Sequence, residues 1–305
     1  MKIPVGYMDR RREGDTVLRQ TQLVLLHLLH VIDKICSDNG IRYWLAWGSC
    51  LGAMRHDGFI PWDDDLDIGL SVKDFKRLIK ILPQALPEDV RLQVPADCPK
   101  VAIPFPKVRD CNSFLFESRP DISTADPSGI YIDIFPFVEI PKVPKVVSDL
   151  FYTVCGSSYH RYHFFLNKGA CSVRSALWCV PLAAACRAVN LAAKGVLWLL
   201  RKILPCPYVG DVFNHGCNFC YRKEWFLSTK KHKFEDGEFP VPVGAEDYLS
   251  VRYGDWHKIP PPEERPSHAR IVDPFRAAVE MESTPMRNAA SELKEEKGVP
   301  GGGVR

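Results

Sequence analysis

The stretch GSCLGAMRHDGFIPWDDDLDIGL, residues 48–70, carries the strongest structural signal in this chain. Four carboxylates fall within five positions of it, at Asp63, Asp64, Asp65 and Asp67. We predict a strand at 65–70, in which side chains alternate, so that Asp65 and Asp67 share one face and the apolar residues face the core. Like charges this close repel strongly where the dielectric is low, so this face needs a cation or full solvation.

A second strand pattern, GIYIDIF at 129–135, contributes one more carboxylate. Tyr131, Asp133 and Phe135 fall on one face and alternate with isoleucines on the other. An ionisable group inside an apolar strand should be paired or bound to a metal. If this strand neighbours 65–70, three carboxylates converge, an arrangement that can hold two Mg²⁺ and suits phosphoryl chemistry.

Three other interpretations of the acidic run compete with this one. The first is a solvated turn, which the apolar flanks disfavour. The second is a calcium loop, but Ile68 stands where the EF-hand pattern needs Gly and Asp74 where it needs Glu. The third is the DxD metal site of a sugar-nucleotide glycosyltransferase, which belongs to a different enzyme class.

The sequence also contains candidate phosphate-binding groups. Gly48 and Ser49 fall at a predicted strand-to-helix junction, where backbone N–H groups can bind a phosphate. Arg55 follows that short helix. Lys107 and Arg109 alternate in a strand-like stretch, so both can face a diphosphate, although a solvated strand face is an equal alternative.

The remaining sequence predicts an α/β (α+β) fold, a mixed sheet flanked by helices with an added helical region. We predict helices at 15–38, 50–54, 72–82, 145–166, 176–204 and 245–253, and strands at 41–47 and near 90–94. We expect the chain to consist of a core (1–141), a helical insertion (142–229), a C-terminal part of the core domain (230–269) and a flexible tail (270–305).

Composition and hydropathy also restrict the possible functions and the expected location of the protein. The 305 residues include 40 Lys+Arg and 37 Asp+Glu, a formal net charge of +3, which is too balanced for a general nucleic-acid binder. The first fourteen residues lack the apolar core of a secretory signal, so we expect a cytoplasmic location. In 176–204 the longest stretch without charge or Asn, 176–186, is too short to span a bilayer. We expect either a helix packed on the core or one lying at the inner face of a membrane.

At this point the chain resembles the LicD family of phosphotransferases, which includes the fukutin-related proteins. The matching text is IRYWLAWGSCLGAMRHDGFIPWDDDLDIGL (41–70), PFPKVRD around Lys107, GIYIDIFP (129–136) and much of 222–269, ending DYLSVRYGDWHKIPPPEERPSHA. Trp47 and Cys50 stand where members more often have a Gly and an apolar residue. Residues 142–221 have no match in this resemblance.

The resemblance implies a nucleotidyltransferase-like fold and transfer of a substituted phosphate, such as phosphocholine or an alditol phosphate. The donor would be a CDP-alcohol such as CDP-choline, and the acceptor a sugar hydroxyl of a surface glycan (lipopolysaccharide, teichoic acid or a glycoprotein glycan), including lipid-linked forms. It also implies Mg²⁺ or Mn²⁺ bound by Asp65, Asp67 and Asp133, with Asp63 a fourth ligand. The alternatives are a nucleotidyltransferase that releases pyrophosphate and a catalytically inactive metal-binding scaffold.

Overall fold

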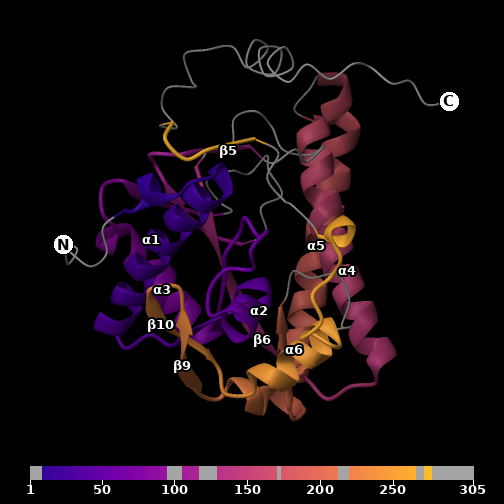
Figure 1. The fold of residues 1–305 in the computed structure, drawn as a ribbon. Helices are drawn as coiled ribbons and strands as arrows, with labels where there is room; N and C mark the ends of the chain where they lie inside the picture. The colour runs from indigo at the N-terminus through magenta and orange to yellow at the C-terminus, as the bar shows by residue number, and fades with distance from the viewer. Residues whose placement is uncertain are drawn as a thin grey trace.

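The computed structural model describes residues 9–94, 105–116, 129–169, 173–211, 220–265 and 271–276. The helices are α1 (Val17–Asp38), α2 (Trp47–His56), α3 (Val72–Ala85), α4 (Lys145–Gly169), α5 (Val173–Ile203) and α6 (Ala245–Tyr253). The strands are β1 (Tyr43–Leu45), β2 (Asp67–Ser71), β3 (Val90–Gln93), β4 (Lys107–Asp110), β5 (Phe114–Phe116), β6 (Tyr131–Ile140), β7 (Tyr208–Asp211), β8 (Tyr221–Arg222), β9 (Thr229–Phe234), β10 (Gly237–Pro242) and β11 (Ile271–Asp273). The predicted α/β class is confirmed (Figure 1).

The longest strand, β6, organises a mixed sheet in the order β1-β2-β6-β4-β3. β2 runs parallel to β6, while β4 runs antiparallel on its other side. The far end of β6 pairs with β7, which in turn pairs with β8. β6 therefore joins the part of the sheet that carries the acidic residues to the part from which the helical region leaves.

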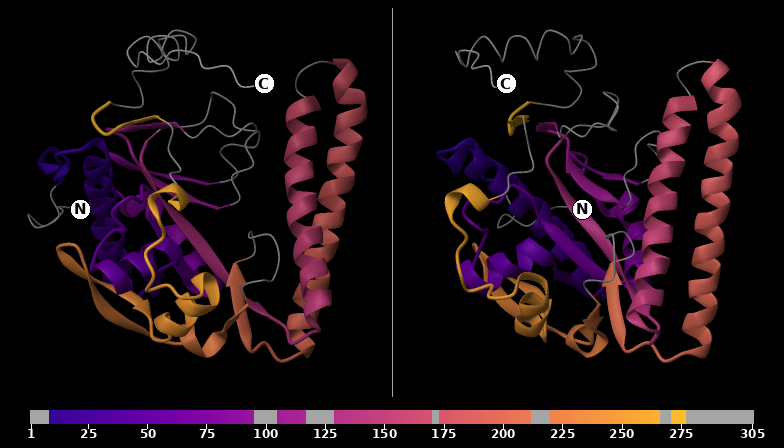
Figure 2. Two further views of the ribbon diagram at one scale, coloured as in Figure 1. Left: turned by 45° about the vertical axis from the view of Figure 1, so that its right-hand side comes forward. Right: turned by 90° about the vertical axis from the view of Figure 1, so that its right-hand side faces the viewer.

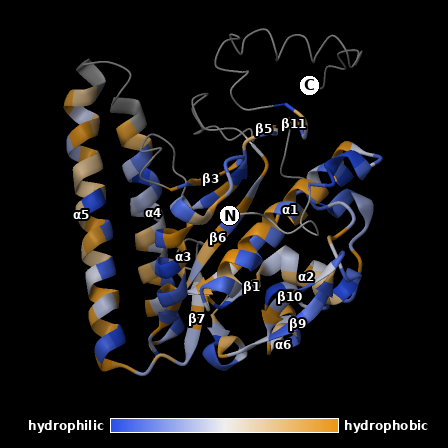
Figure 3. Cartoon of the chain, turned by 90° about the vertical axis from the view of Figure 1, so that its left-hand side faces the viewer, coloured by the Kyte–Doolittle hydropathy of each residue, from blue (hydrophilic) through white to orange (hydrophobic). Residues whose placement is uncertain are grey.

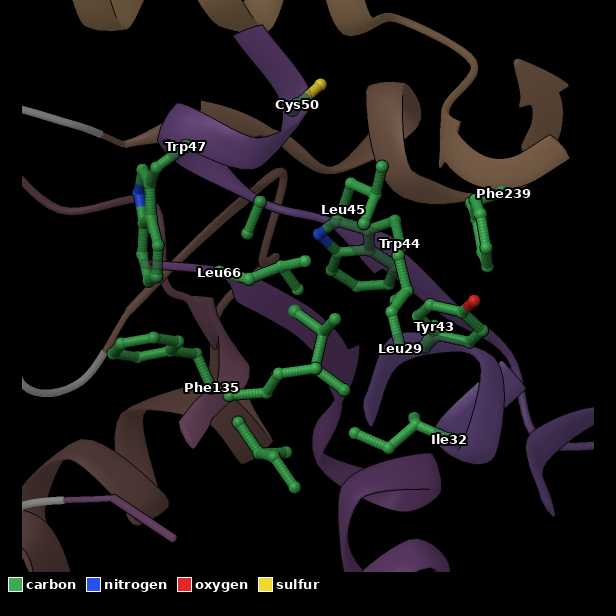
Figure 4. Packing of buried hydrophobic residues seen from close by; sticks show 14 of the residues in the cluster. Leu29, Ile32, Tyr43, Trp44, Leu45, Trp47, Cys50, Leu66, Phe135 and Phe239 are labelled. Carbon is green, nitrogen blue, oxygen red and sulfur yellow. The ribbon is translucent and has the colours of Figure 1, made fainter. Parts of the chain in front are cut away.

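Helices α1 and α3 pack against this sheet. α3 does so through one apolar face, whereas α1 is buried on all sides from Thr21 to Ile32. Both begin where side chains cap the free backbone N–H groups. The Thr16 hydroxyl accepts from the Arg19 N–H at 3.1 Å, and the Ser71 hydroxyl accepts from the Asp74 N–H at 3.1 Å. The core beneath them gathers aliphatic and aromatic side chains from α1, β1, α2 and β6, and Figure 4 shows part of that packing.

Several boundaries differ from the sequence-based prediction. The predicted helix at 50–54 extends to Trp47–His56, and the strand expected at 41–47 shortens to Tyr43–Leu45, because the helix starts at Trp47. The sequence analysis predicted no strand after 230, yet β9 and β10 form a two-stranded antiparallel ribbon. The alternating pattern of a strand was not evident from the sequence, because β9 is rich in Lys and only a few positions of the ribbon, such as Phe234 and Phe239, are buried.

The helical region is a two-helix hairpin made of α4 and α5, 25 and 31 residues long. It leaves the sheet after β6 and returns to it at β7, so the helical part ends at Ile203 rather than extending to 229. In both views of Figure 2 the hairpin stands beside the sheet instead of covering it. The expectation that 176–204 packs on the core therefore does not describe α5, which packs against α4.

Part of the segment predicted as a flexible tail, 270–305, is folded; its residues 277–305 lie outside the described residues. Ile271–Asp273 forms β11, antiparallel to β5. The carbonyl of Pro274 accepts a hydrogen bond from Arg11, whose guanidinium also forms an ion pair with Asp110 on β4 at 2.8 Å. A cation buried in this way ties the N-terminal segment, β4 and the C-terminal segment together.

The Arg11–Asp110 pair generates a stability prediction, because the two side chains are only 6% and 0% exposed. Replacing Arg11 by Met leaves the Asp110 carboxylate buried without this partner, so Arg11→Met should cost about 3–5 kcal/mol of unfolding free energy. Urea denaturation measures it. The neighbouring Arg12 is exposed, so Arg12→Met is the matched control and should change the midpoint little; equal losses in both variants would contradict the proposed tie.

Candidate active site

Three charged residues lie in one row across three adjacent strands. Asp67 on β2 is in register with Asp133 on β6, and Asp133 is in register with Lys107 on β4. Neighbouring strands lie about 4.8 Å apart, so these side chains emerge next to one another on the same face of the sheet. The opposite face of β6 holds Ile132 and Ile134, both buried in the core. The structure thus brings together the two strand patterns that the sequence singled out.

Lys107 is the cation beside the acids. Its ammonium nitrogen Nζ lies 3.1 Å from Asp133 Oδ1, and both side chains are largely buried. The same nitrogen lies 3.3 Å from the centroid of the Tyr131 ring, and the Phe105 ring is the next aromatic neighbour. The alternative of a solvated strand face for Lys107 is therefore wrong. The lysine is held between a carboxylate and an aromatic ring.

Asp67 sits in a strongly anionic environment. Burial raises the pKa of Asp67 well above its usual range. The charges that raise this pKa further belong to Asp65, Asp133 and Asp63, in that order, and Lys107 only partly offsets them. The four carboxylates proposed from the sequence are therefore close enough to interact, and a cation bound among them would relieve their repulsion.

The N-terminus of α2 lies against the same acids. A side chain on Gly48 would bring its Cβ within 3.1 Å of Asp63 Oδ2, so glycine permits this close approach. The Ser49 hydroxyl accepts a hydrogen bond from the Asp67 N–H at 2.8 Å. Ser49 thus holds the start of β2 beside the start of α2, a positioning role that its sequence context did not reveal.

Trp47, the first residue of α2, adopts the left-handed conformation with φ of 40°. This backbone conformation is the reason that glycine suits the position, and it is strained for tryptophan. Two contacts hold it: the Trp47 N–H donates to the Tyr248 hydroxyl at 2.8 Å, and its ring meets Phe135 edge-on with centroids 4.2 Å apart. Figure 4 shows the Trp47 and Phe135 rings side by side next to Leu66.

The structure gives two predicted phosphate ligands other partners. Arg55 donates to the carbonyls of Trp256 and Lys258, so it fastens the segment after α6 to α2. Arg109 donates to the Gln93 side chain at 2.5 Å and to the Gly129 carbonyl at 2.9 Å, and is buried. Phosphate binding was expected of Arg55 because it follows the short helix, and of Arg109 because it alternates with Lys107. Their guanidinium groups are instead engaged by carbonyl and amide oxygens.

Two tyrosines of α6 lie next to the site. Tyr248 anchors the first turn of α2 through the hydrogen bond to Trp47. Tyr253 lies near enough to Asp67 for that carboxylate to contribute to raising its pKa, after burial as the larger cause. Their only sequence signal was the match of DYLSVRYGDW to the family, which does not say which atoms meet the acids.

The donor set fits a hard divalent cation, because carboxylate oxygens are the ligands that Mg²⁺ and Mn²⁺ prefer. Within the described residues, however, no three His, Cys, Asp or Glu side chains already form a ready-made metal site. Asp133 faces Lys107 instead. Asp63, Asp65, Asp67 and Asp133 would hold the cation, and Asp133 would then exchange part of its interaction with the lysine for the metal.

A mixed α/β sheet with carboxylates in register on adjacent strands, beside a helix N-terminus, defines a protein class suited to phosphoryl or nucleotidyl transfer. Residues 40–165 match the family described as LicD/FKTN/FKRP, nucleotidyltransferase domain. The resemblance to the LicD family inferred from the sequence is therefore confirmed over residues 40–165.

The names of curated relatives are consistent with this family match. Lipopolysaccharide cholinephosphotransferase LicD of Haemophilus influenzae is 27% identical over 82% of this chain and 95% of its own length. Ribitol-5-phosphate transferase FKTN of Mus musculus is 30% identical over 44% of this chain, but only 24% of its own length is covered. Ribitol 5-phosphate transferase FKRP of Homo sapiens is 57% identical over 12% of this chain and 7% of its own. The expected enzyme class, a LicD-type transferase, is confirmed at the level of the family.

The two central carboxylates should affect stability in opposite directions. Asp67→Asn removes a buried charge that its neighbours repel, so the metal-free protein should be stabilised, and about 1 kcal/mol would raise Tm by roughly 2–4 °C. Asp133→Asn breaks the buried pair with Lys107 and should cost about 3 kcal/mol. Thermal unfolding in EDTA measures both, with the exposed Asp255→Asn as control.

The benefit of Asp67→Asn should also depend on pH. The pKa of Asp67 is raised in the folded state, so the folded chain binds this proton more tightly than the unfolded chain. Its destabilising effect is therefore full above the raised pKa and disappears as pH falls into the ordinary carboxyl range. The Tm difference between variant and parent should shrink on acidification; a difference that grows as pH falls would contradict the account of this site.

Proposed function

We propose that this chain is a metal-dependent transferase that moves a substituted phosphate, phosphocholine or an alditol phosphate, from a CDP-linked donor to a sugar hydroxyl of a glycan. The observation that carries the proposal is the row of Asp67, Asp133 and Lys107 on adjacent strands. The names of the relatives support it, since they describe transfer of cholinephosphate and of ribitol 5-phosphate. Mg²⁺ or Mn²⁺ is the proposed cofactor.

In the proposed reaction the acceptor hydroxyl attacks the distal phosphorus of the donor diphosphate. A new P–O bond to the glycan forms, the bond from that phosphorus to the bridging oxygen breaks, and CMP leaves while the hydroxyl proton passes to solvent or a nearby base. When bound, the metal supplies positive charge that screens the phosphate oxygens. Phosphoryl transfer needs little more than positioning and charge neutralisation, which is what this site offers.

The residues of the chain have separate tasks in this proposal. Asp65, Asp67 and Asp133 hold the metal, with Asp63 at the entrance of α2. Lys107 places a fixed positive charge where a diphosphate would lie. The first turn of α2, at Gly48 and Ser49, offers backbone N–H groups towards the same place.

The charges favour a diphosphate over a triphosphate donor. An NTP site must neutralise more negative charge than a CDP-alcohol site. Of the three cations predicted near the acids, Arg55 and Arg109 are engaged by carbonyl oxygens, which leaves Lys107 beside the carboxylates. Lys107 and the proposed metal suit a donor with two phosphates, so release of pyrophosphate from an NTP is the disfavoured reaction.

Product analysis tests this proposal directly. The purified protein, incubated with Mg²⁺, a glycan acceptor and a panel of CDP-alcohols and NTPs, should release CMP from one CDP-alcohol. EDTA should abolish the release, and added Mg²⁺ or Mn²⁺ should restore it. Chromatography resolves the nucleotides. Pyrophosphate from an NTP, with no CMP from any CDP-alcohol, would reverse the assignment in favour of nucleotidyl transfer.

Lys107 provides a second test of the same mechanism. Lys107→Met removes the fixed charge that stabilises the transferring phosphate, so kcat should fall by about 100-fold or more. Lys76→Met changes an exposed lysine of α3 outside the site and is the matched control. Thermal melts establish that both variants are folded at the assay temperature. A folded Lys107→Met variant with the parent kcat would remove Lys107 from the mechanism.

A further inference from the structure

The α4–α5 hairpin has its own internal packing. The buried residues of α5 are spaced three, four or seven positions apart, which keeps them on one face of the helix; they are Cys179, Ala183, Asn190, Ala193 and Leu197. They form a single seam against α4, and Asn190 closes it by donating to the Cys155 carbonyl at 2.7 Å and to the Ser158 hydroxyl at 3.1 Å. Most of the remaining circumference of α5 is exposed, although Cys186, Lys194 and Arg201 are half-buried, because the helix packs on no other element to a comparable extent.

That exposed surface is apolar over almost the whole helix. The exposed large hydrophobic side chains on α5 are Leu177, Trp178, Val180, Leu182, Val189, Leu191, Val196, Trp198, Leu199 and Ile203. The two tryptophans are 76% and 60% exposed. Figure 3 shows hydrophobic colour recurring along α5, the outermost helix in that view. Proteins rarely leave a surface this apolar in water, so α5 has a partner.

The charges of the hairpin identify the chemistry of that partner. Asp149 is the one acidic residue in the sequence from 145 to 203. The basic residues in that range are Lys145, Arg161, Lys168, Arg174, Arg187, Lys194, Arg201 and Lys202. Since apolar area and uncompensated positive charge occur on the same element, the hairpin complements a surface that is apolar and anionic.

Two of these cations, Arg187 and Lys202, are exposed on α5, where they could reach lipid headgroups. Arg187, Lys194 and Arg201 are seven residues apart, so they form one stripe beside the seam. The Lys202 ammonium lies over the exposed Trp198 ring, 5.8 Å from its centroid. Aromatic rings and long basic side chains with a charged end are typical of the boundary between acyl chains and headgroups.

The positions of the charged residues also distinguish an α5 that lies in the membrane plane from an α5 that spans the bilayer. By length and composition Ala176–Ile203 could cross a bilayer, so the sequence-based argument that it is too short fails. Yet a spanning α5 would bury Arg187 and Lys194 near its middle, at a cost of about 2.5–3.5 kcal/mol each. It would also carry the paired α4 into lipid, with Asp149 and Arg161.

We infer that the α4–α5 hairpin is a membrane-docking element that lies in the plane of an anionic lipid surface, with the apolar face of α5 in the acyl boundary. The hairpin lies beside the catalytic sheet (Figure 2), so docking would hold the sheet at the membrane. The acceptor glycan would then be linked to lipid; only this consequence rests on the proposed function. The docking itself does not depend on catalysis.

Vesicle flotation of the full-length protein tests the inference without any substrate. At low salt the protein should float with vesicles of phosphatidylcholine and phosphatidylserine, and much less with phosphatidylcholine alone. Leu177→Gln combined with Leu199→Gln removes exposed apolar side chains without adding charge and should weaken binding about tenfold. Leu227→Gln combined with Val17→Gln changes equally exposed apolar residues on the body and should leave binding unchanged.

A second variant isolates the charge. Arg187→Gln with Lys202→Gln should reduce binding to the anionic vesicles by about tenfold, while Lys73→Gln with Lys76→Gln, exposed on α3, should not. Failure to float at low salt would overturn the inference, as would equal binding to both vesicle types. Bound protein that resists alkaline carbonate would show a spanning hairpin, and a lipid-free dimer broken by the leucine variant would show a second copy as the partner; either result overturns it.

Discussion

The site depends on one constraint: the sheet places two carboxylates and a lysine in register on three neighbouring strands. β6 pairs with β2 in parallel and with β4 in antiparallel fashion, and Asp133 meets Asp67 on one side and Lys107 on the other. A shift of register by one residue would move these side chains to the opposite face. The isoleucines of β6 prevent such a shift, because the same shift would bring Ile132 and Ile134 out of the core.

The two carboxylates of this row are in different electrostatic environments. Asp133 is paired with a buried lysine, whereas Asp67 is surrounded mainly by other carboxylates. The site is therefore anchored at one residue and electrostatically strained at the other. The repulsion around Asp67 is reduced by positive charge, either from a metal ion or from the N-terminal end of the α2 dipole. A phosphate-transfer site of this kind therefore needs few basic side chains.

The sequence was sufficient for the parts of the site that lie within single strands. Alternation in DLDIGL and YIDIF predicted which face carries Asp67 and Asp133, and the register of β2 and β6 agrees with it. Asp65 was predicted in the same strand but precedes β2. It was insufficient for Arg55 and Arg109, because the carbonyl oxygens that engage them come from distant segments, near Trp256 and at Gly129. The Arg11–Asp110 pair was missed for the same reason, since almost a hundred residues separate its partners.

The C-terminal segment completes the site from outside the sheet. Tyr248 fixes the strained first residue of α2, and Arg55 fastens the loop after α6 to the last turn of the same helix. Both ends of α2 are thus held by residues about two hundred positions further along the chain. The hairpin enters between these parts of the sequence but joins the sheet only at the far end of β6 and at β7. The sheet can therefore keep its register while the hairpin takes on a separate task.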